Sequence, residues 1–362
     1  MQDTANESLS PYPKIELHVH LEATVRPETL LEISRRNGYS LPVDTVEGIS
    51  DLYRYRDFDH FIEVWILTTN ALRSADDFRS VVVAYAAEAV RHGAVYIEGI
   101  FSPIERTWRG VGWDELFSGY CDGAQEARER HGIEVRLTPD ITRGAEPEDG
   151  VELVRYASKY RERGIVGVGL GGEEALHPPE KFVDAFRLAR EEGLGSVPHA
   201  GEVVGPASIW GALDALQADR IRHGIRAVED PALLRELASR RIVLDVTPLS
   251  NVRTGVVESL DQHPLPELVA AGIPCSVSTD DPEMFDTDLT REYEAAAALG
   301  LDPKDLYAAG VEGALCDEPT RERLRRIGKD YDWAADAPPL RLGAGERLAE
   351  HSARGPAALE ED

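Results

Sequence analysis

Short apolar runs rich in β-branched residues recur eight times along the chain, separated by helical patterns. The runs cover residues 14–20, 95–100, 134–141, 165–170, 195–202, 220–225, 241–248 and 273–281. The stretches between them, such as GVELVRYASKYRERG, place apolar residues three and four positions apart and often end near glycine. Strand–helix alternation favours a parallel sheet, and eight such units predict an α/β fold, a (β/α)8 TIM barrel.

The longest interval between predicted strands, residues 21–94, predicts extra helices after the first strand. PETLLEISRRNG and DFDHFIEVWILTTNALRS are the candidate helices, and helices inserted here would lie over the mouth of the barrel. We expect residues 1–12 to be a flexible N-terminus and residues 13–333 to form a single (β/α)8 domain. Residues 334–362, rich in Ala, Gly, Pro and acid, are predicted to be a tail.

The formal net charge of −27 limits what the protein can bind. Phosphate backbones and anionic lipids would repel it, so nucleic acid and membrane surfaces are poor partners. The cysteines Cys121, Cys275 and Cys316 are few and far apart, which predicts free thiols in a reducing compartment. No apolar run approaches the roughly 20 residues that span a bilayer, and the polar N-terminus lacks the regions of a signal peptide. We therefore expect a cytoplasmic location, and the sequence makes no prediction of oligomeric state.

Histidines and carboxylates cluster at the predicted strand ends. His18 and His20 close the first run two residues apart, so they point to the same side of a strand. The fifth run ends in His199 and Glu202, the sixth carries His223, and the eighth ends in Asp280 and Asp281. In such barrels the C-terminal strand ends surround the active site. Three imidazoles with a carboxylate suit zinc, so these residues predict a metal site. Five of the other histidines are expected at the surface or in caps: His60, His92, His131, His177 and His263.

Two other motifs are incomplete. HLE (residues 20–22) and PC (residues 274–275) begin the H-x-E and P-C-x-x-C signature of one class of zinc-dependent base deaminases. Ser278 stands where the second cysteine of that signature should be, so the match fails. GVGLGGEE, with Gly169, Gly171 and Gly172, lacks the Lys-Ser/Thr of a phosphate-binding loop. Glycine at this place would let the backbone approach a bound ring closely. Because no lysine ends the fourth strand, a pair of metals bridged by a modified lysine is disfavoured and one metal is expected.

Six stretches together resemble the adenosine deaminase family of amidohydrolase-type barrels, which includes adenosine, adenine and 6-aminodeoxyfutalosine deaminases. The stretches are PKIELHVHLEATVRPETL, GVGLGGEE, PHAGE, RIRHG, TPLSNVRTG and STDDPEMFDTDLTREY, in the family's order over about residues 13–295. The resemblance implies zinc-dependent hydrolytic deamination of the 6-amino group of a small purine nucleoside. It implies one Zn²⁺ per chain, held by His18, His20, His199 and Asp280.

The resemblance also implies roles around the purine ring. Glu202 would protonate N1, His223 would take a proton from the attacking water and steer it, and Asp280 belongs to the catalytic set. Asp281 would hydrogen-bond N7, the backbone of Gly172 would meet N3, and Glu22 would meet the sugar 5′-hydroxyl.

The chemistry of the residues agrees with this assignment. Zinc lowers the pKa of water from 15.7 to about 7, which supplies hydroxide at neutral pH. Attack on C6 also needs a proton on N1, so that the ring can accept the electrons. Glu202 lies three residues after His199 and can therefore reach the same pocket without binding the metal. Burial against the substrate would keep its carboxyl group protonated.

Two departures from the family pattern lie on the sugar side of the pocket. Many adenosine-specific members have Asp-Gly where this chain has Glu22-Ala23, and Ala-Gly-Asp-Glu where it has GGEE. Adenosine is the first expectation for the substrate. The alternatives are free adenine, whose deaminases also carry glutamate at this place, and 6-aminodeoxyfutalosine, an adenine nucleoside enlarged at its 5′ side in menaquinone synthesis. The non-enzymatic alternative is a silent barrel that binds a nucleoside or a partner, but such a barrel would be expected to lose a ligand or the acid, and none is missing.

Overall fold

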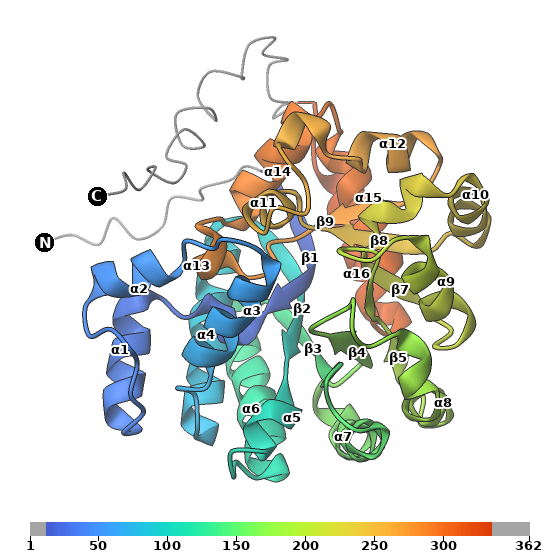
Figure 1. Cartoon of the computed structure of the whole chain (residues 1–362). Helices are drawn as coiled ribbons and strands as arrows, with labels where there is room; N and C mark the ends of the chain where they lie inside the picture. Colours follow the sequence, from blue (N-terminus) through green and yellow to red (C-terminus); the bar gives the residue numbers. More distant parts are fainter. Residues whose placement is uncertain (1–11, 335–362) are drawn as a thin grey trace, which may run out of the picture. The chain divides into compact units, whose positions relative to one another are not determined.

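The computed structural model describes residues 12–334, and its barrel body runs to Tyr331 (Figure 1). The strands are β1 (Lys14–His20), β2 (Ala94–Phe101), β3 (Glu134–Thr142), β4 (Gly167–Gly171), β5 (Gly195–Ser196), β6 (His199–Ala200), β7 (Arg220–His223), β8 (Val243–Val246) and β9 (Cys275–Val277). They pair in parallel in the orders β1-β2-β3-β4-β5 and β6-β7-β8-β9. The expected (β/α)8 barrel is therefore confirmed.

Helices surround these strands (Figure 1). After β1 come the 3₁₀ turn η1 (Leu21–Thr24) and helices α1 (Pro27–Arg36), α2 (Val46–Leu52), α3 (Phe58–Thr69) and α4 (Ala75–Arg91). The crossovers hold α5 (Pro103–Thr107), α6 (Trp113–His131), α7 (Pro147–Lys159), α8 (Val183–Glu191), α9 (Pro206–Asp214), α10 (Pro231–Arg240), α11 (Pro248–Arg253) and α12 (Leu265–Ala270). After β9 come α13 (Pro282–Phe285), α14 (Leu289–Ala298), α15 (Pro303–Gly313) and α16 (Glu318–Asp330). The extra helices predicted after the first strand are present as α1 to α4.

The fifth predicted strand differs from expectation because it is broken into β5 and β6. Pro198 lies between the two pieces, and proline has no N–H to donate to a ladder. The fourth strand begins at Gly167, and Ile165 before it makes only an isolated bridge to Leu137. The predicted N-terminus and tail lie outside the described residues, apart from Tyr12 and Ala334.

The barrel closes between β1 and the segment after β9. Val19 and Asp280 form a parallel bridge in which Asp280 N–H donates to His18 O at 3.0 Å and His20 N–H donates to Asp280 O at 2.8 Å. The pairing of β1 with β2 shifts register between Glu16 and Val19. The Ser278 hydroxyl accepts hydrogen bonds from the backbone N–H groups of Leu17 and His18 there, at 3.0 and 3.2 Å. The serine that breaks the cysteine motif thus supports the irregular strand that presents both histidines.

Helix α3 is held over the mouth of the barrel by an aromatic cluster. The Asp57 side chain caps its start by accepting from the N–H of His60 at 2.8 Å. Its buried residues Phe61 and Trp65 then pack with Ala23 of η1 and with Met284 and Phe285 of α13. The apolar face of α3 therefore forms one wall above the strand ends.

All three cysteines are free thiols, as expected. Among residues 12–334, no helix is both long enough and apolar enough to cross a membrane.

Candidate active site

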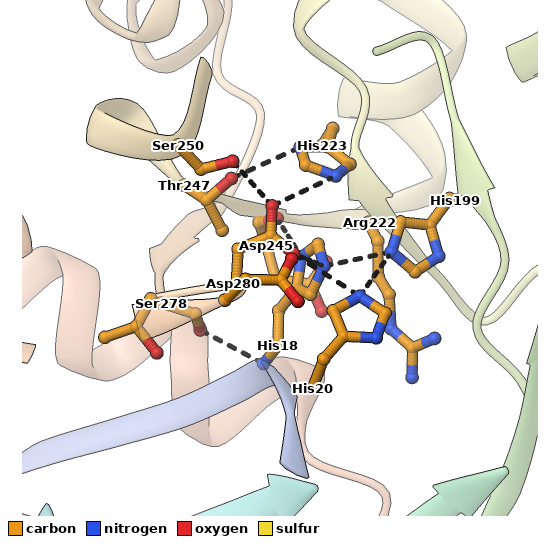
Figure 2. A network of polar contacts seen from close by, with 12 residues as sticks. His18, His20, His199, Arg222, His223, Asp245, Thr247, Ser250, Ser278 and Asp280 are labelled. Atoms are coloured by element: carbon orange, nitrogen blue, oxygen red, sulfur yellow. Dashed lines mark hydrogen bonds and ion pairs between the residues drawn. The ribbon is translucent and has the colours of Figure 1, made fainter. Parts of the chain in front are cut away.

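Three histidines and one aspartate converge at the C-terminal ends of the strands (Figure 2). The Nε2 atoms of His18 and His20 lie 3.0 and 3.2 Å from Nε2 of His199. Both also lie 3.3 Å from Oδ1 of Asp280. A tetrahedral zinc ion with ligand distances of about 2.0–2.1 Å separates its ligand atoms by about 3.3–3.4 Å. The observed separations are therefore close to those of a zinc site, and the residues present fit the metal.

Backbone oxygens orient two of the imidazoles by holding their other ring nitrogen. Nδ1 of His199 lies 3.0 Å from Leu170 O, and Nδ1 of His18 lies 3.4 Å from Asp245 O. Asp140 also approaches Nδ1 of His199, at 3.3 Å from its Oδ2. Donation from Nδ1 leaves the Nε2 lone pair facing the cluster, which is the arrangement of a metal-binding histidine.

The electrostatics of the cluster favour a positive charge. Burial lowers the pKa of His20, but the carboxylates of Asp281 and Asp280 outweigh it and raise this pKa to about 9. Burial opposes ionisation of Asp280, yet the neighbouring His18 holds its pKa well below the ordinary value. Burial lowers the pKa of His199 to about 3, which favours a neutral ring with a free lone pair. A divalent cation would supply the positive charge that the carboxylates favour.

Asp280 and His223 adopt strained backbone conformations. Their φ angles are +66° and +63°, in the left-handed region that residues other than glycine seldom occupy. The Ser250 hydroxyl donates to Oδ2 of Asp280 at 2.6 Å, which leaves Oδ1 facing His18 and His20. The aspartate is thereby fixed with one oxygen toward the candidate metal position.

His223 lies beside His18, with their ring centroids 4.7 Å apart. Its Nε2 is 3.9 Å from Oδ2 of Asp280 and 3.5 Å from Oε2 of Glu202. Ligand atoms of His18, His199, His223 and Asp280 all lie within 4.8 Å of one another, while His20 groups with Asp280 and Asp281. The shorter distances of His20 favour it over His223 as the fourth ligand. His223 then stands between the metal position and Glu202.

A chain of polar contacts that the sequence analysis missed controls the His223 ring. The N–H of Leu265 donates to Nδ1 of His263 at 3.1 Å, so the hydrogen of His263 is on Nε2, 3.1 Å from Oδ1 of Asn251. The Asn251 amide nitrogen lies 3.2 Å from Nδ1 of His223 and donates to it. A neutral His223 therefore carries its hydrogen on Nε2, toward the cavity. His263 is buried rather than at the surface, but it follows a 3₁₀ turn and its side chain accepts the first N–H of α12, so the expected capping role is confirmed.

Glu202 and Asp281 line the same cavity as the cluster. Burial raises the pKa of Glu202 well above its ordinary value, and the charges of Asp280 and Glu174 act in the same direction. Burial also raises the pKa of Asp281 well above its ordinary value, and Trp65 Nε1 donates to its Oδ1 at 2.7 Å. Both shifts favour the protonated carboxylic acid, which is the form that can donate a proton or a hydrogen bond.

The glycines within β4 and directly after it serve two purposes. A Cβ on Gly169 would lie 2.0 Å from Oδ1 of Asp140 and 2.3 Å from Nη1 of Arg222, so this glycine makes room for an ion pair inside the protein. Gly172 has φ +101° and lines the cavity, where a Cβ would meet nothing closer than 3.7 Å. The expectation of close approach to a ring thus fits Gly172 but not Gly169.

That Glu22 meets the sugar 5′-hydroxyl stays a prediction, and its nearest polar contacts are protein groups at the start of and within α5. Glu22 is buried and is not among the residues that line the cavity. Its Oε1 accepts the N–H of Ser102 at 2.7 Å and lies 3.8 Å from Nη2 of Arg106. Ser102 and Glu105 line the cavity in its place. The residues next to Glu22 in the sequence could not predict its contacts with Ser102 and Arg106, because these contacts depend on how α5 packs.

Comparisons with known proteins agree with this geometry. The family model described as adenosine deaminase matches residues 13–329. An aminodeoxyfutalosine deaminase from Acidothermus cellulolyticus is 56% identical over 349 residues, which cover 94% of this chain and 98% of that protein. The crystal structure of adenine deaminase from Arthrobacter aurescens has a TM-score of 0.85 at 29% identity and covers 90% of this chain and 100% of that one. A crystal structure of an amidohydrolase from Burkhoderia ambifaria with bound Zn has a TM-score of 0.80 at 27% identity and covers 90% of each chain.

The fold and the site define a metal-dependent barrel hydrolase of the amidohydrolase type. Within that class, the chain belongs to the adenosine deaminase family.

Proposed function

We propose that the protein catalyses the hydrolytic deamination of 6-aminodeoxyfutalosine, using one zinc ion per chain. The observation that carries the choice of substrate is the 56% identity with an aminodeoxyfutalosine deaminase over nearly the full length of both chains. This relative favours the enlarged nucleoside over adenosine, our first expectation from the sequence. The reaction adds hydroxide to C6 and a proton to N1; the hydrogen of the new hydroxyl group then passes to the 6-amino group, the C6–N bond breaks, ammonia leaves and C6 becomes a carbonyl.

We assign the metal to His18, His20, His199 and Asp280, because their ligand atoms converge at zinc-like separations. When bound, zinc would make water acidic enough to supply hydroxide near neutral pH. Asp280 also offers Oδ2, which already accepts the hydrogen of Ser250, to the attacking water.

Glu202 and Asp281 bind the purine ring as protonated carboxylic acids, the form that their raised pKa values favour. The Glu202 carboxyl donates its proton to N1, so that the ring can accept electrons as C6 is attacked. Asp281 donates a hydrogen bond to N7, and Trp65 fixes its other oxygen. The backbone of Gly172, which lines the cavity, meets N3.

His223 acts as a hydrogen-bond donor in this account. Asn251 occupies its Nδ1, so Nε2–H faces Asp280 and Glu202 and can orient the attacking water. This differs from the role that the family resemblance implies, in which His223 takes the proton.

The 5′ side of the substrate would lie along α3. Phe58, Ile62 and Ile66 line the cavity there and are each partly exposed. Such an apolar wall can bury an enlarged 5′ group, and each Å² of apolar surface buried contributes about 25 cal/mol. Ser102 and Glu105 offer polar contacts at the same wall.

Free adenine is the second candidate, since adenine deaminase from Arthrobacter aurescens has a similar structure. The test compares kcat/KM for 6-aminodeoxyfutalosine, adenosine, 5′-deoxyadenosine and adenine. The proposal predicts the highest value for 6-aminodeoxyfutalosine, at least about tenfold above adenine, because adenine leaves the α3 wall unburied. A higher value for adenine would replace this proposal by the second candidate. Bound zinc without turnover of any 6-aminopurine would support the silent barrel.

A further inference from the structure

Glu174, in the segment after β4, binds the backbone of the loop that carries Glu202. Its Oε1 accepts hydrogen bonds from Gly201 N and Ser208 Oγ, both at 2.5 Å, and its Oε2 accepts from Val203 N at 2.8 Å and Val204 N at 3.0 Å. A carboxylate offers about four lone-pair sites, so this one is filled. Glu174 is only 6% exposed and lines the cavity, and apart from the effect of its charge on the pKa of Glu202 it has no part in the proposed reaction.

The loop wraps around this carboxylate in a way that fixes the direction of Glu202. The N–H groups on either side of Glu202, those of Gly201 and Val203, both point to Glu174. Gly201 makes the bend with φ +71°, where a Cβ would lie 2.3 Å from Cδ1 of Ile209. The Glu202 side chain meanwhile lines the cavity.

We propose that Glu174 is a positioning residue for the proposed acid, Glu202, and holds its carboxyl group where it can reach the ring nitrogen of a bound substrate. The inference rests on the proposed function of Glu202. A purely structural role is the competing explanation, because Ser208 belongs to α9 and the same contacts tie that helix to the barrel.

Glu174→Gln tests the proposal with little change in size. A glutamine has one acceptor oxygen, and its amide would turn two hydrogens toward N–H or O–H groups that also donate. We expect kcat for 6-aminodeoxyfutalosine to fall about 10–100-fold, the range of lost outer-sphere support, while KM changes less. Zinc content per chain should stay the same, because none of the four hydrogen bonds of Glu174 involves a proposed zinc ligand.

A double-mutant cycle separates positioning from general damage. In the Glu202→Gln background, Glu174→Gln should cause no further loss of kcat, because the acid that it positions is gone. Ser208→Ala removes one of the four donors and is the milder variant should Glu174→Gln fail to fold. Its smaller loss should vanish in the same background.

Hydrogen exchange supplies a readout independent of turnover. In zinc-loaded Glu174→Gln, the amides of residues 201–204 should exchange at least about tenfold faster, while those of β7 keep their protection. Equal losses of kcat in both backgrounds, or unchanged exchange in the loop, would overturn the inference. A wild-type protein inactive on every 6-aminopurine would instead overturn the proposed function, and the exchange result would still decide whether Glu174 holds the loop.

Discussion

The two ends of β7 both carry buried charged groups, and they differ in how those charges are balanced. At its start, Arg220 donates to Oε2 of Glu98 at 2.8 Å and to Oδ2 of Asp245 at 2.6 Å, and Gly313 O accepts from the same guanidinium. At its end, His223 faces a cluster in which the Nε2 atoms of His18, His20 and His199 converge on Asp280 (Figure 2).

In the first cluster the guanidinium of Arg220 supplies the positive charge. In the second, lone pairs of imidazole and carboxylate groups face a common point. Buried charge is tolerated when a partner of opposite sign satisfies it, so the Arg220 cluster can serve the fold alone. Converging imidazole and carboxylate lone pairs instead suit a metal ion. The comparison teaches that the arrangement of donors and acceptors, rather than burial, separates the proposed active site from the barrel's internal framework. The predictions below follow that division.

Asp280→Asn should have the largest effect on activity. It removes the charge that faces both His18 and His20, so the site should lose zinc, and turnover should fall by more than about 10⁴-fold, beyond the contribution of one proton-transfer group. Metal analysis and deamination of 6-aminodeoxyfutalosine measure both effects, with thermal unfolding as the check on folding. A variant that keeps zinc and wild-type turnover would remove Asp280 from the proposed ligand set.

Glu202→Gln should keep zinc but lower kcat by about 10²–10⁴-fold, the usual contribution of a general acid. In the wild type, burial raises the pKa of this acid well above its ordinary value, and activity should fall as pH rises through that pKa. The residual rate of Glu202→Gln should lack this alkaline decline. Full activity in the variant, or an identical decline, would exclude Glu202 as the acid.

Arg220→Met should have the opposite effect to the two preceding variants: it should lower the stability of the fold and leave the metal site and the activity intact. The variant leaves Glu98 and Asp245 buried without their cation, and breaking a buried pair in this way costs about 3–5 kcal/mol of the free energy of unfolding. Urea unfolding measures the loss, with zinc content and kcat of the folded protein expected near wild type. Arg325→Met, which breaks an exposed pair with Glu318 on α16, is the matched control and should leave stability unchanged. A loss of zinc in Arg220→Met without loss of stability would undo the division between the two ends of β7.

Asp140→Asn should have a smaller effect on the metal site than Asp280→Asn, and it also leaves the buried Arg222 without its carboxylate partner. Asp140 connects Arg222 to Nδ1 of His199 and so orients a proposed ligand from behind. We expect zinc affinity to fall about 10–100-fold, which competition with a chelator of known affinity would measure. Unchanged affinity would show that the contact with Leu170 O alone orients the ring.

Much of the candidate site could be predicted because its residues end strands. Alternation in KIELHVH placed His18 and His20 on one side, and the βα alternation brought them to the same edge as His199 and Asp280. The sequence could not reveal contacts that depend on packing between loops. The chain from His263 through Asn251 to His223 is one example, and the placement of Glu22 behind Ser102 is another.

The break between β5 and β6 shows the same limit in the fold. Pro198 lies inside a run that is otherwise typical of a strand, so the pattern predicted one strand where the missing N–H divides it into two.

Zinc content measured against turnover tests the central claim most directly. The purified protein is stripped with a chelator, reloaded in steps with Zn²⁺, and assayed at each step for metal per chain and for deamination of 6-aminodeoxyfutalosine. The account predicts that activity rises in proportion to zinc and saturates at about one ion per chain. Full turnover in protein that holds no divalent metal would contradict it.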